Sequence, residues 1–486
     1  MKSPALFAAA WVAAPLATLC ASPPALAADE AALQQLRAEV RQMRQDYETR
    51  IQALEQRLRE AEPRAPTASA TTAAAASPAV GDASGWNAAA APGGSAPAST
   101  AAPSSVVAAA PATRGFNPEV SLILGGSYQR LSRNPDQYRL QGFMPGDGEV
   151  GPGSRSFNLG ESELGLAASV DPYFSGRATL AFDADNHVNV EEAYARTSAL
   201  PAGLTLQGGR FYSALGYLNS QHKHTWDFAD APLAYQAFLG GQFKQDGAQL
   251  RWLAPTDRYT EIALEAGRGN SFPGTGPSGN GLGAWALTAH VGDDLGDSAS
   301  WRLGASYLHT RARDRAYTEL DGVQNSFSGR SRLWAVDGVL KWAPGGNATR
   351  TSFKLQGEYF HRLESGELTY DSASAALPLA YRSAQSGWYV QGVYQFLPAW
   401  RVGLRYDRLN SGTPRIGSNA GVGPASFAAL GRYNPSRSTV MLDYAPTEFS
   451  RLRLQVALDR SRPGGNDRQW FLQYIMSLGA HGAHSF

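Results

Sequence analysis

The stretch from Arg451 to Asp459 reads RLRLQVALD and alternates between polar and apolar side chains. Successive side chains of a β-strand point to opposite faces, so this stretch predicts a strand with one apolar and one wet face. The same alternation occurs at 301–310, 331–342, 351–362, 388–396 and 401–408. Alternating segments of about ten residues, separated by turn residues, are typical of transmembrane β-strands.

The connections between these strands distinguish a soluble β-protein from a membrane barrel. The short connections are 171–172, 200–203, 254–257, 292–299, 343–350, 397–399 and 445–449. The long ones are 132–156, 212–245, 269–282, 311–330, 363–385 and 410–435. Short periplasmic turns that alternate with long outer loops are typical of outer-membrane barrels, so residues 115–486 are expected to form an all-β, antiparallel transmembrane barrel of about sixteen strands.

The N-terminus predicts export. Lys2 precedes an apolar stretch from Ala5 to Leu19, and a small-residue cleavage site follows at residues 25–27, so residues 1–27 are expected to be a signal peptide. Cys20, the single cysteine, lies inside it, and the mature chain is therefore expected to have no disulfide. No later run is long and apolar enough for a transmembrane helix.

Residues 28–62 are expected to form a periplasmic coiled coil that joins subunits, because apolar residues recur every three or four positions. The seam is Leu33, Leu36, Val40, Met43, Tyr47, Ile51, Leu54 and Leu58. A single amphipathic helix lying on the protein or on a membrane is the alternative. Residues 63–114 are dominated by Ala, Pro, Ser, Thr and Gly and are expected to be a disordered linker.

Charge and motifs exclude several classes of function. The chain has 43 basic and 42 acidic residues, which argues against a nucleic-acid partner. No nucleophile elbow, P-loop or His-Glu-x-x-His motif occurs, so an enzyme is not expected. A barrel of this size encloses an aqueous lumen unless loops fill it, so passage of small solutes is the default function.

The stretch 210–243 is too long and too aromatic for an ordinary outer loop, and we expect it to fold inward and narrow the lumen. Packing on a neighbouring subunit is the alternative. The candidate pore and constriction residues are Arg210, His222, Lys223, His224, Trp226, Asp227, Asp230, Arg251, Arg302, Lys354, Arg405 and Arg453. His222 and His224, with Asp227 and Asp230 nearby, could also bind zinc, although His-x-His in a loop is more often ordinary polar packing. No other cofactor is expected.

Four stretches resemble a family of proteobacterial outer-membrane proteins described as porin-like or, loosely, as zinc-regulated TonB-dependent receptors. They are FNPEVSLILGGSY (116–128), GESELGLAASVDPYF (160–174), VEEAYARTSALPAGLTLQGGRFYSALGYLNSQHKHTWDFADAPLAYQAF (190–238) and LGAHGAHSF (478–486). The layout of coiled coil, linker and barrel is also similar to phosphate-selective porins O and P and to dicarboxylate-channel porins, which implies a homotrimer. A TonB-dependent receptor would need about twenty-two strands and a plug domain, which residues 29–114 cannot form.

The leading hypothesis is therefore a trimeric porin in the outer membrane of a Gram-negative cell, with its N-terminal segment in the periplasm. It would contact outer-membrane lipid and pass small hydrophilic solutes, with anions as the favoured class. One alternative is a receptor or binding protein for zinc uptake or handling. Another is a structural tether that acts through the coiled coil.

Overall fold

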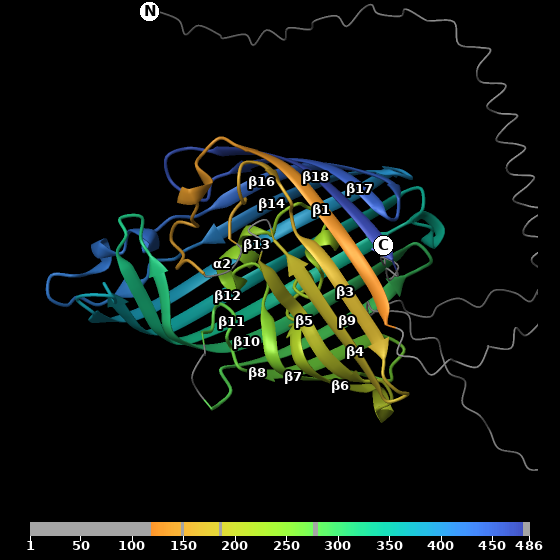
Figure 1. Cartoon of the computed structure of the whole chain (residues 1–486), viewed down its shortest axis with the longest axis horizontal. Coiled ribbons are helices and arrows are strands. Elements are labelled where there is room, and N and C mark those ends of the chain that lie inside the picture. Colours follow the sequence, from red (N-terminus) through yellow and green to blue (C-terminus); the bar gives the residue numbers. More distant parts are fainter. Residues whose placement is uncertain (1–117, 147–149, 184–186, 276–279, 480–486) are drawn as a thin grey trace, which may run out of the picture. The chain divides into compact units, whose positions relative to one another are not determined.

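The described part of the chain forms one antiparallel sheet that closes on itself (Figure 1). The computed structural model describes residues 118–146, 150–183, 187–275 and 280–479. The expected signal peptide, coiled coil and linker lie outside these residues. Strand β1 (Glu119–Leu131) pairs with both β3 (Ser162–Ser169) and β18 (Asp467–Gly479), and this double pairing closes the barrel.

Sixteen of the strands make the wall, as predicted. The others besides β1, β3 and β18 are β4 (Phe174–Phe182), β5 (Val188–Thr197), β6 (Leu204–Tyr212), β7 (Lys244–Leu253), β8 (Tyr259–Gly267), β9 (Ala284–Leu295), β10 (Ala299–Thr318), β11 (Gln324–Trp342), β12 (Ser352–Tyr370), β13 (Leu377–Leu397), β14 (Trp400–Asn410), β16 (Ser436–Thr447) and β17 (Ser450–Asp459). Two short strands, β2 (Ser156–Asn158) and β15 (Arg415–Ile416), pair at the edges of this wall.

The helical elements are short. They are α2 (Leu233–Leu239) and the single 3-10 turns η1 (Pro135–Gln137), η2 (Pro201–Gly203), η3 (Lys223–Thr225), η4 (Pro344–Gly346), η5 (Pro424–Ser426) and η6 (Ala428–Leu430). Within the described ranges, no helix has both the length and the apolar character needed to cross a membrane.

The alternation predicted for 451–459 is confirmed in β17. Arg453 and Gln455 point inward and are buried, whereas Leu454 and Leu458 point outward with 43% and 45% of their surface exposed. Outward apolar side chains recur around the wall, and outward aromatic residues such as Trp334 and Trp388 lie among them. An exposed apolar surface of this extent is what a barrel presents to lipid.

Two stretches expected to be outer loops are instead strand. Most of 311–330 belongs to β10 and β11, and most of 363–385 belongs to β12 and β13. The reason is that cross-strand pairing continues to Thr318 opposite Gln324 and to Tyr370 opposite Leu377. The inward side of this extension buries a second apolar cluster, formed by Met144, Ala312, Tyr317, Phe327, Leu368, Leu379, Tyr381, Phe427, Ala429 and Leu430.

The two ends of the barrel differ. β1 begins and β18 ends at the same end of the barrel, where the short turns also gather (Figure 1). Glu119, the first residue of β1, lies at this end, opposite Ala167 near the end of β3. The long strands β10–β13 extend at the other end. In outer-membrane barrels the short turns face the periplasm, so the extended end is the outer end.

Candidate functional site: the segment inside the barrel

The connection between β6 and β7, residues 213–243, runs through the inside of the barrel, and we call it the inward segment (Figure 1). Its inward course confirms the prediction made from its aromatic content. Asn219 fastens the two ends of the segment together. Its side-chain amide donates to the carbonyls of Ser213 and Phe243, both at 2.9 Å, and its side-chain oxygen accepts from the Phe243 N–H at 2.7 Å.

Helix α2 (LAYQAFL) is apolar on most of its surface, with Gln236 its one amide side chain, a composition that is typical of a buried helix. All seven of its residues are buried, because the barrel wall surrounds them. The Tyr235 ring meets the Phe360 ring edge-on, with centroids 5.3 Å apart, and Leu409 belongs to the same apolar cluster. The helix ends at Gly240 with φ +65°, a left-handed conformation that glycine adopts without strain.

Glu358 on β12 is the first of three attachment points for the segment. Its carboxylate accepts hydrogen bonds from the hydroxyls of Tyr235 at 2.9 Å and Tyr389 at 2.6 Å. It also accepts from the backbone N–H groups of Tyr217 at 3.2 Å and Leu218 at 3.1 Å. A buried carboxylate satisfied in this way rigidifies whatever donates to it. It therefore ties both arms of the segment to one strand.

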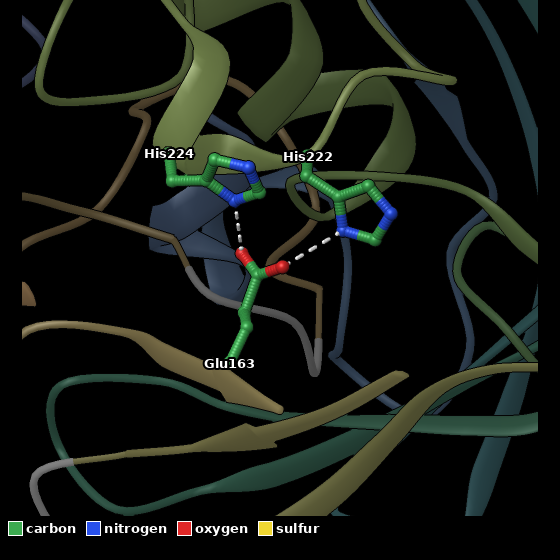
Figure 2. A group of neighbouring side chains, drawn as sticks. All are labelled: Glu163, His222 and His224. Carbon is green, nitrogen blue, oxygen red and sulfur yellow. Dashed lines mark hydrogen bonds and ion pairs between the residues drawn. The ribbon is translucent and has the colours of Figure 1, made fainter. Parts of the chain in front are cut away.

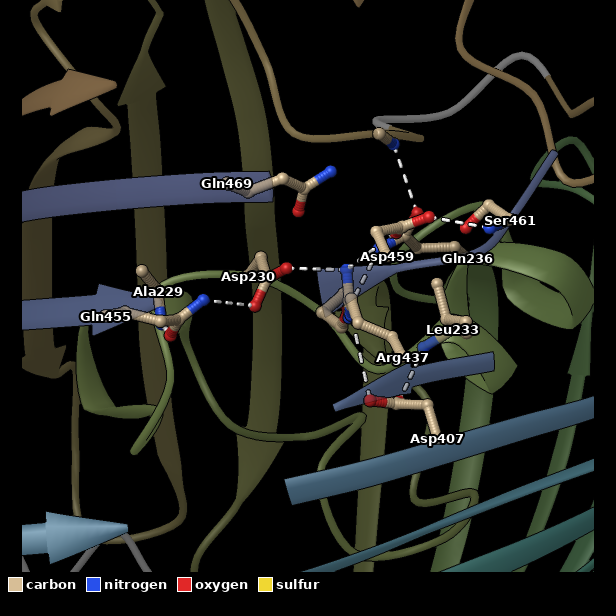
Figure 3. Close-up of polar contacts among 12 residues, drawn as sticks. Ala229, Asp230, Leu233, Gln236, Asp407, Arg437, Gln455, Asp459, Ser461 and Gln469 are labelled. Atoms are coloured by element: carbon tan, nitrogen blue, oxygen red, sulfur yellow. Dashed lines mark hydrogen bonds and ion pairs between the residues drawn. The ribbon is translucent and has the colours of Figure 1, made fainter. Parts of the chain in front are cut away.

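The second attachment is a buried ionic network that receives Asp227 and Asp230 of the segment, and Figure 3 shows the part around Asp230. Asp230 binds Arg405 at 2.7 Å and Arg437 at 2.6 Å, and the Gln455 amide donates to it at 2.9 Å. Burial raises the pKa of the Asp230 carboxyl, but Arg437 and Arg405 outweigh burial and hold that pKa below its usual range.

Neighbouring contacts extend this network along the segment. Asp407 of β14 accepts from the Leu233 N–H at 2.9 Å, where α2 begins. Asp227 pairs with Lys354 and, at 3.4 Å, with Arg401. Burial also opposes charge on Asp227, and the two cations again keep the pKa of its carboxyl low. The segment therefore supplies acids to strands that supply bases.

In the third attachment the segment supplies the bases and the wall supplies the acids (Figure 2). One Glu163 oxygen lies 2.8 Å from His224 Nδ1, and the other lies 3.1 Å from His222 Nδ1. His222 also lies 3.3 Å from Glu191 and 3.0 Å from Glu192 of β5. Burial lowers the pKa of His222, but these carboxylates outweigh it and raise that pKa well above its usual value.

The donor atoms of this third group converge enough for a cation. Glu163, His222 and His224 each offer one ligand atom within 4.8 Å of the others. Two imidazoles and a carboxylate are a common protein ligand set for zinc. The sequence had suggested Asp227 and Asp230 as the carboxylates beside these histidines, but both instead bind arginine or lysine on strands β12, β14 and β16. The acids that meet the histidines come from β3 and β5.

The remaining candidate pore residues differ in how they relate to the inward segment. Arg210 forms an ion pair with Asp246 of β7 at 2.6 Å and stays apart from the three attachments. Lys223 pairs with Glu161, and Trp226 is buried, with its carbonyl accepting from Arg453 at 2.7 Å. Arg251 lies 3.6 Å from Glu261 and also stays apart from the segment. Arg302 lies 3.2 Å from Asp337 and does contact the segment, because it donates to the Gly216 carbonyl at 3.3 Å and lies over the Tyr217 ring.

Sequence reasoning did not assign several residues to the site: Glu191, Glu192, Glu358, Tyr235, Asn219 and Arg437. The adjacent acids at 191–192 and the Glu-x-Glu at 161–163 were visible as paired carboxylates. They could have been matched to the histidines by charge alone. Nothing in the sequence indicates that Glu358 receives backbone N–H groups from a segment more than a hundred positions away.

Water reaches the inward faces of the wall unevenly. At the level of the segment, Glu265, Arg362, Asp407 and Gln455 are each 0% exposed although they point inward from different parts of the wall. Towards the periplasmic end the inward cations are partly accessible, with side-chain exposures from 15% to 30%. The inward segment therefore occupies much of the lumen at its own level. We call the region on its periplasmic side, where the inward cations are more accessible to water, the vestibule.

A closed wall of sixteen strands, an apolar outer surface and a charged interior crossed by an inward segment define a porin-like outer-membrane β-barrel channel. The chain belongs to the same family as an uncharacterized protein of Aquifex aeolicus (strain VF5). The two are 31% identical over 397 residues, covering 77% of this chain and 81% of the relative. No family model matches the chain.

Solved structures with a general likeness are outer-membrane proteins. They include in-vitro folded OmpT of Vibrio cholerae (TM-score 0.46, 10% identity, covering 74% of this chain and 97% of that one). Similarity to the channel DcaP of Acinetobacter baumannii has a TM-score of 0.43 and 12% identity, covering 75% of this chain and 98% of that one. Similarity to an anion-selective porin from Comamonas acidovorans has a TM-score of 0.45 and 9% identity, covering 75% of this chain and 100% of that one.

Proposed function

We propose that this protein is a porin through which small hydrophilic solutes diffuse passively, with a constriction set by the inward segment. The observation that carries this proposal is the attachment of that segment to opposite parts of the wall, through Glu163 on one side and Arg405 and Arg437 on the other. A segment held at several points limits the cross-section that a solute can use. We therefore expect a small single-channel conductance.

We further propose a mild preference for anions, because basic side chains outnumber acidic ones where the vestibule is accessible. These cations are Arg177, Arg251, Arg302, Lys354, Arg401 and Arg451. Their acidic partners, Glu192, Glu261, Asp337, Asp227 and Asp443, lie deeper, with side-chain exposures of 0% to 11%. Charged groups lining a pore favour ions of the opposite sign.

Planar-bilayer recording of the folded full-length protein tests both parts. A passive porin gives stepwise conductance in symmetric salt, and anion preference gives a reversal potential of the corresponding sign across a salt gradient. Absence of conductance at every voltage would refute the channel proposal. A reversal potential near zero would remove only the anion preference.

A second candidate function is divalent-cation binding at Glu163, His222 and His224. The convergence of their ligand atoms favours it, as does the choice of imidazole and carboxylate donors. A bound zinc ion would tie η3 of the inward segment to strand β3. Binding at this place could serve zinc handling or could hold the segment in position.

Calorimetry with Zn²⁺ tests this second candidate. The double variant His222→Gln/His224→Gln should lose binding at this position, whereas His187→Gln, an exposed histidine on the rim, should bind as the wild type does. Equal binding by all three proteins would refute the site.

We also propose that the protein is exported, is a homotrimer, and uses residues 28–62 as a periplasmic coiled coil on the 63–114 linker. Mass photometry of the full-length protein and of a deletion of residues 28–62 tests the assembly. Loss of trimers in the deletion supports the coiled coil as the contact between subunits. If trimers persist, the segment is free to act as a tether to another periplasmic component.

A further inference from the structure

Arginines form a row across the outer face of the extended strands, beyond the aromatic residues of the wall. Arg311 of β10 lies directly opposite Arg330 of β11, which lies opposite Ser365 of β12. Ser365 lies opposite Arg382 of β13, and Arg382 lies opposite Arg415 of β15. Since neighbouring strands are about 4.8 Å apart, the row spans roughly 20 Å. We call it the arginine row.

The side chains of the row face outward. Thr310, Ser331 and Glu364, the inward neighbours in the same strands, are buried at 0%, 1% and 2% exposure. The four arginines are exposed, as the alternation of a strand requires. The row is therefore on the side of the wall that faces the surroundings of the barrel and takes no part in the lumen.

The row lacks acidic partners of its own. Among the described residues, no ion pair or side-chain hydrogen bond involves the guanidinium groups of Arg311, Arg330, Arg382 or Arg415. Arg332 and His309, paired with each other, add basic groups two positions nearer the membrane. Like charges directly opposite in a sheet repel each other. An anion between the arginines would convert this repulsion into attraction.

The surface at the row is hollowed. A hollow of about 680 Å³ is lined by Arg330, Ser365, Arg382 and Arg415. Gly329 and Gly366, which have no side chains, also line it. The space beneath the arginines stays open to a group of the size of a lipid phosphate.

The height of the row indicates what would occupy it. Tyr307 and Trp334 face each other on the same two strands, with ring centroids 4.4 Å apart, and lie on the outward face. Aromatic girdles mark the level of the lipid headgroups. Arg311 and Arg330 are each four positions beyond these aromatics, or about 10 Å higher for a tilted strand. The arginines are therefore at or just above the outer-leaflet headgroups.

We propose that the arginine row binds the phosphate groups of an anionic lipid in the outer leaflet. Arginine suits this role because its planar guanidinium donates two parallel hydrogen bonds to a phosphate. Ser365 offers a further hydroxyl between Arg330 and Arg382. This inference uses the proposed outer-membrane orientation but not the proposed conductance, so either can fail without the other.

Binding of full-length protein in neutral-detergent micelles, with and without phosphatidylglycerol, tests the site. The double variant Arg330→Gln/Arg382→Gln should lose affinity for phosphatidylglycerol by about thirtyfold, which corresponds to about fivefold per arginine. The matched control is Arg130→Gln/Arg468→Gln, which removes two outward arginines from β1 and β18. It should bind as tightly as the wild type.

Three results would overturn the proposal. If both double variants lose the same affinity for phosphatidylglycerol, the binding depends on the net charge of the protein and not on the arginine row. Equal affinity for inorganic phosphate and for phosphatidylglycerol would identify a site for soluble anions instead of lipid. No loss in Arg330→Gln/Arg382→Gln would exclude the row altogether. Unchanged circular dichroism and an unchanged thermal unfolding transition confirm that each variant is folded.

Discussion

The inward segment is held by two parts of the wall that carry opposite charge. Towards β12, β14 and β16 the segment presents Asp227 and Asp230 to lysine and arginine. Towards β3 and β5 it presents His222 and His224 to glutamates. The comparison teaches that the wall is polarised across the lumen, and that a short segment with acids at one place and bases at another is oriented by that polarity.

The two sides should differ in strength. The Asp230 side chain is 7% exposed and those of Arg405 and Arg437 are 1% exposed, so removal of its charge leaves two buried cations that share Asp407 as their remaining close carboxylate. Removing one member of a buried ion pair costs about 3 to 5 kcal/mol. The histidine side is more accessible to water, with 12% of the His222 side chain exposed, and His222 has three carboxylates within 3.3 Å.

The largest expected effect is therefore that of Asp230→Asn. It should release the segment on the arginine side, lower the stability by about 3 kcal/mol or more, and increase single-channel conductance. Thermal unfolding and bilayer recording measure the two effects. Asp297→Asn, at an exposed position in a periplasmic turn, is the control and should change neither. A normal conductance in Asp230→Asn would argue that the segment does not set the constriction.

A somewhat smaller effect is expected from Gly216→Ala. Gly216 has φ +69°, and a Cβ there would lie 2.2 Å from a Glu358 oxygen, so alanine would push the segment off β12. A left-handed alanine alone costs about 1 to 2 kcal/mol. Gly322→Ala is the control. Gly322 has φ +89°, and an added Cβ would have no atom within 4 Å, so this variant carries the backbone cost without the clash. If the two variants lose equal stability, the contact with Glu358 is unimportant.

Acid should loosen the arginine side. Because the pKa of Asp230 is lowered in the folded protein, its contribution to stability is complete above its unfolded pKa of about 3.9 and is lost as pH falls through the folded value. Arg405, Arg437 and Gln455 face it from the wall. Conductance should thus hold steady down to pH 4 and rise only below it. A rise already at pH 6 would contradict this.

The smallest expected effect is that of a chelator. If zinc joins Glu163 to the two histidines, EDTA should lower the unfolding temperature of zinc-loaded wild type by a few degrees and leave His222→Gln/His224→Gln unchanged, whereas Asp230→Asn should still respond. Protein that never saw zinc is the control. If EDTA lowers the unfolding temperature of both variants equally, the chelator does not act through this cluster.

Much of the wall could be predicted from the sequence, and the contacts inside it could not. Alternation along 451–459 predicted β17 because the period of two belongs to the strand backbone itself. The inward course of 213–243 followed from its aromatic content. The partners of its charged residues did not, because Asp230 and Arg437 are separated by most of the barrel and meet only when the sheet closes.

The sequence by itself therefore determined the antiparallel barrel, its strand count and the end that bears the short turns, since these follow from local periodicity and from the lengths of connections. Only the tertiary structure decided that His222 meets Glu163 and that Arg330 stands between Arg311 and Ser365. A shift of one residue in strand register would turn each arginine of the row from the outer face to the lumen. Register depends on the pairing of whole strands, and no single strand encodes it.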